Sequence, residues 1–293
     1  MICRAPYRAG AESYPCGQCM TCRINRNRLW SHRMMLEQRC HAQSCFVTLS
    51  YAPAHLPDGG HLCLRDVQLW FKRLRDRLKP VRVRYFMVGE YGELGGRPHY
   101  HVALFGAGPE RDHVRNPHFR VRCFCPWCKL MEETWSFGNV DTGELNVRSA
   151  AYIGGYVMKK MTNASDPRLC GKPPEFARMS LKPGIGCPAV PSVSASLNSS
   201  VGARLIAKLG DVPTSLTHGR KNLPLGRYLR SKLREDLGVD SAQYRETNYA
   251  KVRDLCTLHG TVKGSEEAKL LPETQKILNM ETRAKIYAKK GNQ

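Results

Sequence analysis

Two histidines one residue apart are the feature of this chain that most clearly suggests chemistry. His99 and His101 begin an apolar run, Val102–Phe105, that is typical of a β-strand. Because side chains alternate across a strand, both imidazoles point to one face and Tyr100 points to the other. Two imidazoles on one face form half of a metal site. An isolated pair of surface histidines on an edge strand is the simpler interpretation, so the rest of the chain must decide.

Two tyrosines at helical spacing offer a nucleophile. Residues four apart share one face of a helix, so Tyr152 and Tyr156 would present neighbouring hydroxyls, with Lys159 close to Tyr156. Tyrosines at this spacing are more often core residues, but a lysine beside a phenol favours its ionised form and can bind phosphate. A tyrosine hydroxyl that attacks a DNA phosphorus gives a covalent phosphotyrosine and a free 3′-hydroxyl.

Glycines and basic residues around these groups are candidate DNA contacts. Gly154 and Gly155 each cost about 1 kcal/mol relative to alanine inside a helix, a loss that core packing alone does not explain. Without side chains, they would let a nucleic-acid backbone approach closely. Lys160, beside the tyrosines, and Arg97, beside the histidines, could bind phosphate.

The histidines and tyrosines fit one metal-dependent reaction. A divalent metal held by His99, His101 and a third ligand would polarise a DNA phosphate. A hard, open coordination position favours Mg²⁺ or Mn²⁺. Glu90, at the end of the adjacent predicted strand, is our choice of third ligand, although a solvated glutamate before a glycine turn explains it nearly as well. Lys159 would neutralise the charge that develops on the phosphate.

The cysteines predict a structural zinc site. There are 13, an odd number, and no secretory signal precedes them, so reduced thiols and metal ligands are favoured over disulfides. Most of those at zinc-knuckle spacing fall in two groups: Cys3, Cys16, Cys19 and Cys22, then Cys123, Cys125 and Cys128. One Zn²⁺ needs four tetrahedral ligands. Either Cys3 completes the first group, or the pairs 16/19 and 125/128 form two knuckles of one ribbon.

Charge and hydropathy restrict the partners. The 293 residues include 46 Lys and Arg against 25 Asp and Glu, a formal net charge of +21. Such a field attracts polyanions, of which nucleic acid is the commonest. The sequence has no apolar run long enough to span a bilayer and no lipidation signal or signal peptide. We therefore expect no membrane partner and no small-molecule substrate.

The order of the predicted elements specifies an α+β fold. A basic-flanked helix at 29–41 is followed by strands at 45–51, 83–90, 100–105 and 140–147, with helices at 66–78, 131–135 and 149–161. From 45 to 147 the order is β-α-β-β-α-β, the split βαβ or ferredoxin-like pattern, in which helices cover one face of the sheet. The histidine pair then lies on an internal strand, which would hold a metal site rigidly.

These motifs, in this order, resemble those of the HUH endonucleases that start rolling-circle replication. An apolar strand with Thr48 precedes the two histidines, and Tyr156 is followed three residues later by Lys159. The segments that resemble replication initiators of gokushovirus-type microviruses are PCGQCMTCR (15–23), GEYGE (89–93), GRPHYH (96–101), AAY with YVMKK (150–160), and MS with KPGIG (179–186). The resemblance implies a nicking and joining enzyme that uses Mg²⁺ or Mn²⁺ and two alternating tyrosines. Tyr152 departs from the pattern, because Gly155 stands where a basic residue is usual.

The resemblance also predicts the domain organisation. We expect a Cys-rich segment and helix at 1–40, an HUH endonuclease domain at 41–189, a linker at 190–200, and a basic, mainly helical region at 201–293. The linker follows from its serine-rich composition. Within the last region, helices are expected at 228–237 and 266–290.

The predicted function is replication initiation. The chain would nick single-stranded origin DNA, form a 5′-phosphotyrosine with a free 3′-hydroxyl primer, and later rejoin the ends into a circular viral genome. A host helicase and replication machinery would be its partners, in the cytoplasm of an infected bacterium. A plasmid relaxase or transposase would use the same chemistry. A non-enzymatic zinc-containing DNA-binding protein or a DNA-condensing protein would explain the charge but not the tyrosine pair.

Overall fold

The computed structural model describes residues 3, 6–9, 12–92, 95–110, 113, 123–159, 166–219 and 221–239. The chain divides into two compact units. One contains Arg28–Val193, and the other combines Met1–Asn27 with the chain from Ser194 onward. The predicted helix at 266–290 lies outside the described residues. None of the described helices is long and apolar enough to cross a bilayer.

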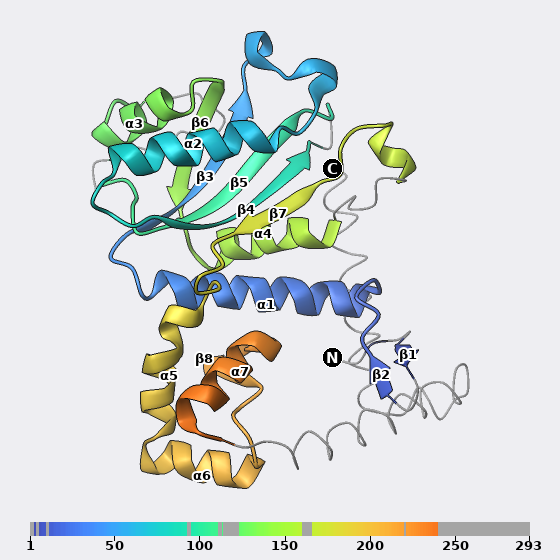
Figure 1. Cartoon of the computed structure of the whole chain (residues 1–293), viewed down its shortest axis with the longest axis vertical. Helices are drawn as coiled ribbons and strands as arrows, with labels where there is room; N and C mark the ends of the chain where they lie inside the picture. The colour runs from blue at the N-terminus through green and yellow to red at the C-terminus, as the bar shows by residue number, and fades with distance from the viewer. Residues whose placement is uncertain are drawn as a thin grey trace. The chain divides into compact units, whose positions relative to one another are not determined.

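A five-stranded antiparallel sheet forms the centre of the unit Arg28–Val193, as Figure 1 shows. The strands are β3 (Ser44–Tyr51), β4 (Arg84–Tyr91), β5 (Pro98–Phe105), β6 (Gly138–Glu144) and β7 (Phe176–Met179). Their order is β6-β3-β5-β4-β7. The first four are arranged as a split βαβ sheet, which confirms the predicted fold class. The strand β5, which carries the histidine pair, is internal as predicted, and β7 is an additional strand.

The two crossover helices cover one face of this sheet. They are α2 (Leu64–Arg77) and α3 (Pro126–Thr134). Trp70 and Leu74, four residues apart on α2, are fully buried against Val47 and Leu49 of β3. This is the arrangement of helices on one face that the element order predicts.

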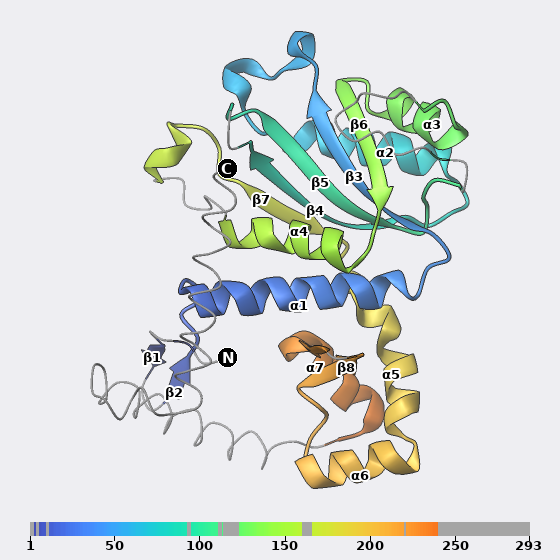
Figure 2. The ribbon, with the colours of Figure 1, turned by 180° about the vertical axis from the view of Figure 1, so that it is seen from behind.

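The opposite face is also covered, by α1 (Met20–Gln38) and α4 (Val147–Lys159), as the two views in Figures 1 and 2 show. Met34 of α1 and Ile153 of α4 are fully buried with Phe86 of β4. The first helix begins nine residues before its predicted start, because the sequence from 20 to 28 contains no glycine or proline that would end it. Residues 28–38 therefore belong to the sheet-containing unit, which extends before the predicted boundary at 41.

The remaining described elements are short. They are β1 (Tyr7–Ala9), β2 (Glu12–Tyr14), α5 (Val190–Leu197), α6 (Ser200–Leu209), β8 (Ser215–His218), β9 (Lys221–Pro224), α7 (Gly226–Leu237), and 3₁₀ turns at Pro53–His55, Asp58–Gly60, Pro167–Leu169 and Cys187–Ala189. The helix α7 confirms the prediction at 228–237. The linker predicted at 190–200 is wrong: Val190, Ser194 and Leu197 are buried at helical spacing, and the Ser199 side chain caps α6.

Candidate active site

The sheet register brings the predicted metal ligands together. Glu90 of β4 lies opposite His99 of β5, and Thr48 of β3 lies opposite His101. Directly opposed residues of an antiparallel pair share a face. All four side chains therefore lie on the face of the sheet that α4 covers, while Tyr100 is buried in the core on the other face, as predicted.

His101 is held by a hydrogen bond on each ring nitrogen. Nε2 lies 2.9 Å from the Glu90 carboxylate oxygen Oε1, and Nδ1 lies 3.1 Å from the Thr48 hydroxyl. The side chains of His101 and Glu90 are only 7% and 12% exposed. Because a threonine hydroxyl can donate or accept, Thr48 can fix the ring whichever nitrogen carries the proton.

The residues fit a divalent metal ion. Burial, and then the neighbouring His101, lower the pKa of His99, which favours the neutral imidazole that metals require. The buried His99 Nδ1 forms no hydrogen bond of normal geometry among the described residues. The 2.9 Å between His101 Nε2 and Glu90 Oε1 matches the roughly 3 Å that separates adjacent ligands in an octahedral site with bonds of about 2.1 Å. Two imidazoles and one carboxylate form a plausible donor set for such an ion.

The helix α4 places both tyrosines against this cluster. The Tyr156 ring stacks on His101, with 4.9 Å between ring centroids and 9° between planes. The Tyr152 ring meets His101 edge-on, at 5.3 Å. The Tyr156 hydroxyl donates a hydrogen bond to the Tyr152 hydroxyl. The structure therefore brings together the histidine and tyrosine motifs, which are about 50 residues apart in the sequence.

The two phenols differ in environment. Tyr152 is 50% exposed, whereas Tyr156 is partly buried. Burial, the hydrogen bond with Tyr152 and the negative charge of Glu90 raise the pKa of Tyr156. In the absence of metal and DNA, Tyr156 is therefore protonated. The side chain of Lys159, which was expected to favour the phenolate, and the whole of Lys160 lie outside the described residues.

A pocket of about 1010 Å³ opens beside these groups. His101 and Tyr152 line it, together with His113, Arg148 and Asp141. We call it the β6 pocket, because the edge strand β6 and the residues that follow it supply much of its wall. Its position makes Tyr152 accessible from one side of the metal-ligand cluster.

The candidate DNA contacts are placed differently from one another. Arg97 is exposed, and its guanidinium donates a 2.8 Å hydrogen bond to the Tyr51 carbonyl. Gly154 is buried in α4, and Gly155 is partly buried. The buried position of Gly154 favours a role in packing α4 rather than in DNA contact, because a nucleic-acid backbone cannot reach it directly.

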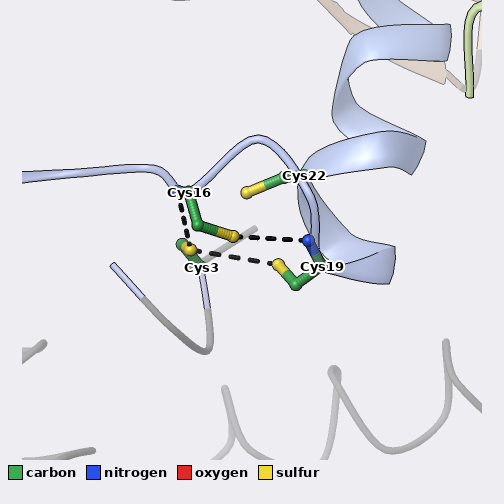
Figure 3. A group of neighbouring side chains, drawn as sticks. All are labelled: Cys3, Cys16, Cys19 and Cys22. Carbon is green, nitrogen blue, oxygen red and sulfur yellow. Dashed lines mark hydrogen bonds between the residues drawn. The ribbon is translucent and has the colours of Figure 1, made fainter. Parts of the chain in front are cut away.

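The first cysteine group forms a complete four-ligand cluster, drawn in Figure 3. The sulfurs of Cys3, Cys16, Cys19 and Cys22 all lie within 4.8 Å of one another. Gly17 adopts a left-handed conformation, φ +72°, in the turn after Cys16. The backbone amides of Gln18 and Cys19 consequently donate to Cys16 Sγ, at 3.4 and 3.3 Å, and lower the pKa of this thiol to about 6.

The second group is separate and has a different composition. Cys125 and Cys128 lie with Cys123 and with His113, all ligand atoms within 4.8 Å of one another. Of the two predicted arrangements, the structure therefore has the one in which Cys3 completes the first group, not the shared ribbon. His113 was missed, because the ten residues between it and Cys123 follow no short metal-binding spacing.

Comparisons with known proteins agree with these motifs. Residues 44–162 match the family model described as Replication-associated protein ORF2. Replication-associated protein VP4 of Bdellovibrio phage phiMH2K is 30% identical over 164 residues, which cover 53% of this chain and 50% of that protein. Replication-associated protein ORF2 of Spiroplasma virus 4 is 30% identical over 184 residues, 60% of this chain and 56% of that protein.

A third relative, Replication-associated protein ORF4 of Chlamydia phage 1, is 29% identical over 158 residues, 52% of this chain and 39% of that protein. The chain thus spans about half the length of the curated relatives it matches. No solved structure matches the chain significantly. The family match covers β3 to the end of α4 and so includes the histidine pair and both tyrosines. Through this segment, the chain belongs to the ORF2 family of phage replication-associated proteins.

Proposed function

We propose that this chain starts rolling-circle replication of a single-stranded DNA phage, as a metal-dependent endonuclease and strand transferase. The observation that carries the proposal is the stacking of Tyr156 on His101, 4.9 Å between centroids, with Glu90 hydrogen-bonded to the same imidazole. Core tyrosines have no need of such a donor set. The replication-associated names of the matched phage proteins support the same interpretation.

His99, His101 and Glu90 would hold Mg²⁺ or Mn²⁺. When bound, such an ion supplies Lewis-acid polarisation of a phosphate oxygen. The hydroxyl oxygen of Tyr156 forms a bond to phosphorus while the bond from phosphorus to the 3′-oxygen breaks. The phenol proton leaves through the Tyr152 hydroxyl, which already accepts it in a hydrogen bond, toward the solvent of the β6 pocket. The departing 3′-oxygen takes up a proton and becomes the primer hydroxyl, and Lys159 would neutralise charge on the phosphate.

Two tyrosines allow the reaction to be repeated before the first ester is resolved. After one round of synthesis, Tyr156 is still esterified to DNA, so a second hydroxyl must attack the regenerated origin. Tyr152 lies one helical turn away and contacts the same imidazole. The free 3′-hydroxyl then attacks the first phosphotyrosine, which releases a circle and regenerates Tyr156.

Glu90→Gln tests the metal assignment. Glutamine keeps the shape of the side chain and can accept from His101, but it removes the negative charge. We expect the Mn²⁺ concentration for half-maximal cleavage of single-stranded DNA to rise by about tenfold or more, since charged oxygen ligands dominate affinity for hard cations. Circular dichroism should be unchanged. An unaltered metal titration would remove Glu90 from the site, and cleavage that survives thorough chelation would contradict metal dependence altogether.

Zinc in the first cysteine group would stabilise the unit that contains the N-terminus. Structural zinc sites contribute folding free energy directly. Cys16→Ser with Cys19→Ser should therefore lose one equivalent of zinc and lower the melting temperature by roughly 5 °C or more. Cys170→Ser, an exposed cysteine outside both groups, is the matched control. Freshly purified, reduced protein without zinc would return these cysteines to ordinary thiols.

The partners and location follow from the proposed role. Single-stranded and origin DNA is the substrate, a host helicase and the replication machinery are the partners, and the cytoplasm of an infected bacterium is the place of action. A plasmid relaxase or transposase would use the same residues, but the matched relatives are phage and virus proteins. A non-enzymatic zinc-containing DNA-binding protein leaves the contact of both tyrosines with His101 without a purpose.

A further inference from the structure

The second cysteine group has the chemistry of a metal site, although no motif of the nuclease uses it. We propose that His113, Cys123, Cys125 and Cys128 bind one zinc ion that fixes a wall of the β6 pocket. Three sulfurs and one imidazole nitrogen form a common tetrahedral zinc set. All four ligand atoms already lie within 4.8 Å of one another.

The distances around His113 agree with a shared ion. Its Nδ1 lies 3.5 Å from Cys125 Sγ and 3.4 Å from Cys128 Sγ. A tetrahedral zinc with Zn–N and Zn–S bonds of about 2.05 and 2.3 Å separates nitrogen and sulfur by about 3.6 Å. The nitrogen and both sulfurs therefore need to move very little to share one ion.

The other ring nitrogen of His113 is oriented as in known metal sites. His113 Nε2 lies 3.1 Å from the carbonyl oxygen of Thr142 on β6. Because a carbonyl oxygen only accepts, Nε2 carries the hydrogen, and the lone pair of the neutral ring is on Nδ1, toward the thiols. Metal-ligating histidines usually donate their second N–H in this way, which fixes the tautomer.

The same contact positions the cluster at the edge of the sheet. The strand β6 is an edge strand, and the Trp127 indole at the start of α3 donates a 3.2 Å hydrogen bond to the Thr142 hydroxyl. His113 lines the β6 pocket together with His101 and Tyr152. It also lines a neighbouring cavity of about 580 Å³ with Cys123 and Cys128. A zinc ion here would cover the edge of β6 and hold the wall between the two cavities.

The test is metal content and ligand type, neither of which depends on nuclease activity. Cys125→Ser with Cys128→Ser should contain one equivalent of zinc fewer than the unmodified chain, and Cys170→Ser should contain the same amount. In the Cys16→Ser, Cys19→Ser protein, which lacks the first cluster, X-ray absorption should find three sulfurs and one nitrogen around the zinc that remains. An unchanged zinc content in the Cys125, Cys128 variant, or four sulfurs with no nitrogen, would overturn the proposal.

Two further variants separate loss of the site from misfolding. His113→Cys keeps four ligands and should retain the equivalent of zinc with a four-sulfur environment, whereas His113→Ala should lose it. In His113→Ala, hydrogen exchange should increase in β6 while β4 and β5 stay protected. Full zinc occupancy in His113→Ala, or exchange that increases equally in all three strands, would contradict the proposed role.

Discussion

Tyr156→Phe is expected to lose most of the covalent adduct with single-stranded DNA. Phenylalanine keeps the ring that stacks on His101 but has no oxygen to bond to phosphorus. Removing a nucleophile from residues that act as a unit costs roughly 10³-fold or more in rate. The measurement is the amount of protein that migrates with labelled DNA after denaturation. Tyr85→Phe, which changes a tyrosine on the opposite face of the same sheet, should form adduct at the normal rate.

Tyr152→Phe should have a different consequence. It should cut once, because Tyr156 is intact, but it should fail to release unit-length circles in a complete replication assay. Normal circle formation would reduce Tyr152 to packing or DNA stacking and leave a single-tyrosine mechanism. If Tyr152→Phe alone abolished the first nick, the order of the two tyrosines would be reversed, which its exposure of 50% makes the natural alternative.

His99→Ala and His101→Ala are expected to abolish cleavage while DNA binding is retained. Metal-ion catalysis supplies several kcal/mol of transition-state stabilisation, so losing a ligand should lower the rate by about 10²-fold or more. Affinity for DNA should change little, since it comes from many Lys and Arg contacts with phosphates. Cleavage kinetics and filter binding on the same oligonucleotide give the two quantities.

Two observations keep this prediction specific. His218→Ala, an exposed histidine on β8, should cleave normally. An equal loss of cleavage and binding in His99→Ala and His101→Ala would indicate misfolding or a structural role, because His101 is buried in the sheet. Thermal unfolding of each variant distinguishes these two explanations.

Local periodicity was sufficient to predict the central sheet. Alternating apolar residues located β3, β4 and β5 within two residues of their bounds, and the order of strands and helices implied their arrangement. The shared face of His99 and His101 follows directly from strand alternation. Glu90 was also within reach, because a strand that precedes a short connection to β5 pairs with it, and the register brings it opposite His99.

Other features depend on contacts between distant segments, which periodicity does not encode. The hydrogen bond from Thr48 to His101 requires the register of β3 against β5, 53 residues apart. His113 joins the second cysteine group only because its ring reaches Thr142 on β6. The serine-rich segment that forms α5 was mistaken for a linker, since its composition concealed three buried positions at helical spacing. The buried position of Gly154 is likewise a property of packing against the sheet.

The most direct test of the central claim is to locate the bond between protein and DNA. The chain would be incubated with Mn²⁺ and single-stranded oligonucleotides tiled across the DNA that encodes it, then denatured, digested and analysed by mass spectrometry. We predict a nucleotide joined through a 5′-phosphate to Tyr156, with a minor population on Tyr152, and no adduct after chelation of the metal. Metal-dependent cleavage that leaves no nucleotide on either tyrosine, with both 5′-phosphate and 3′-hydroxyl ends free, would contradict the account.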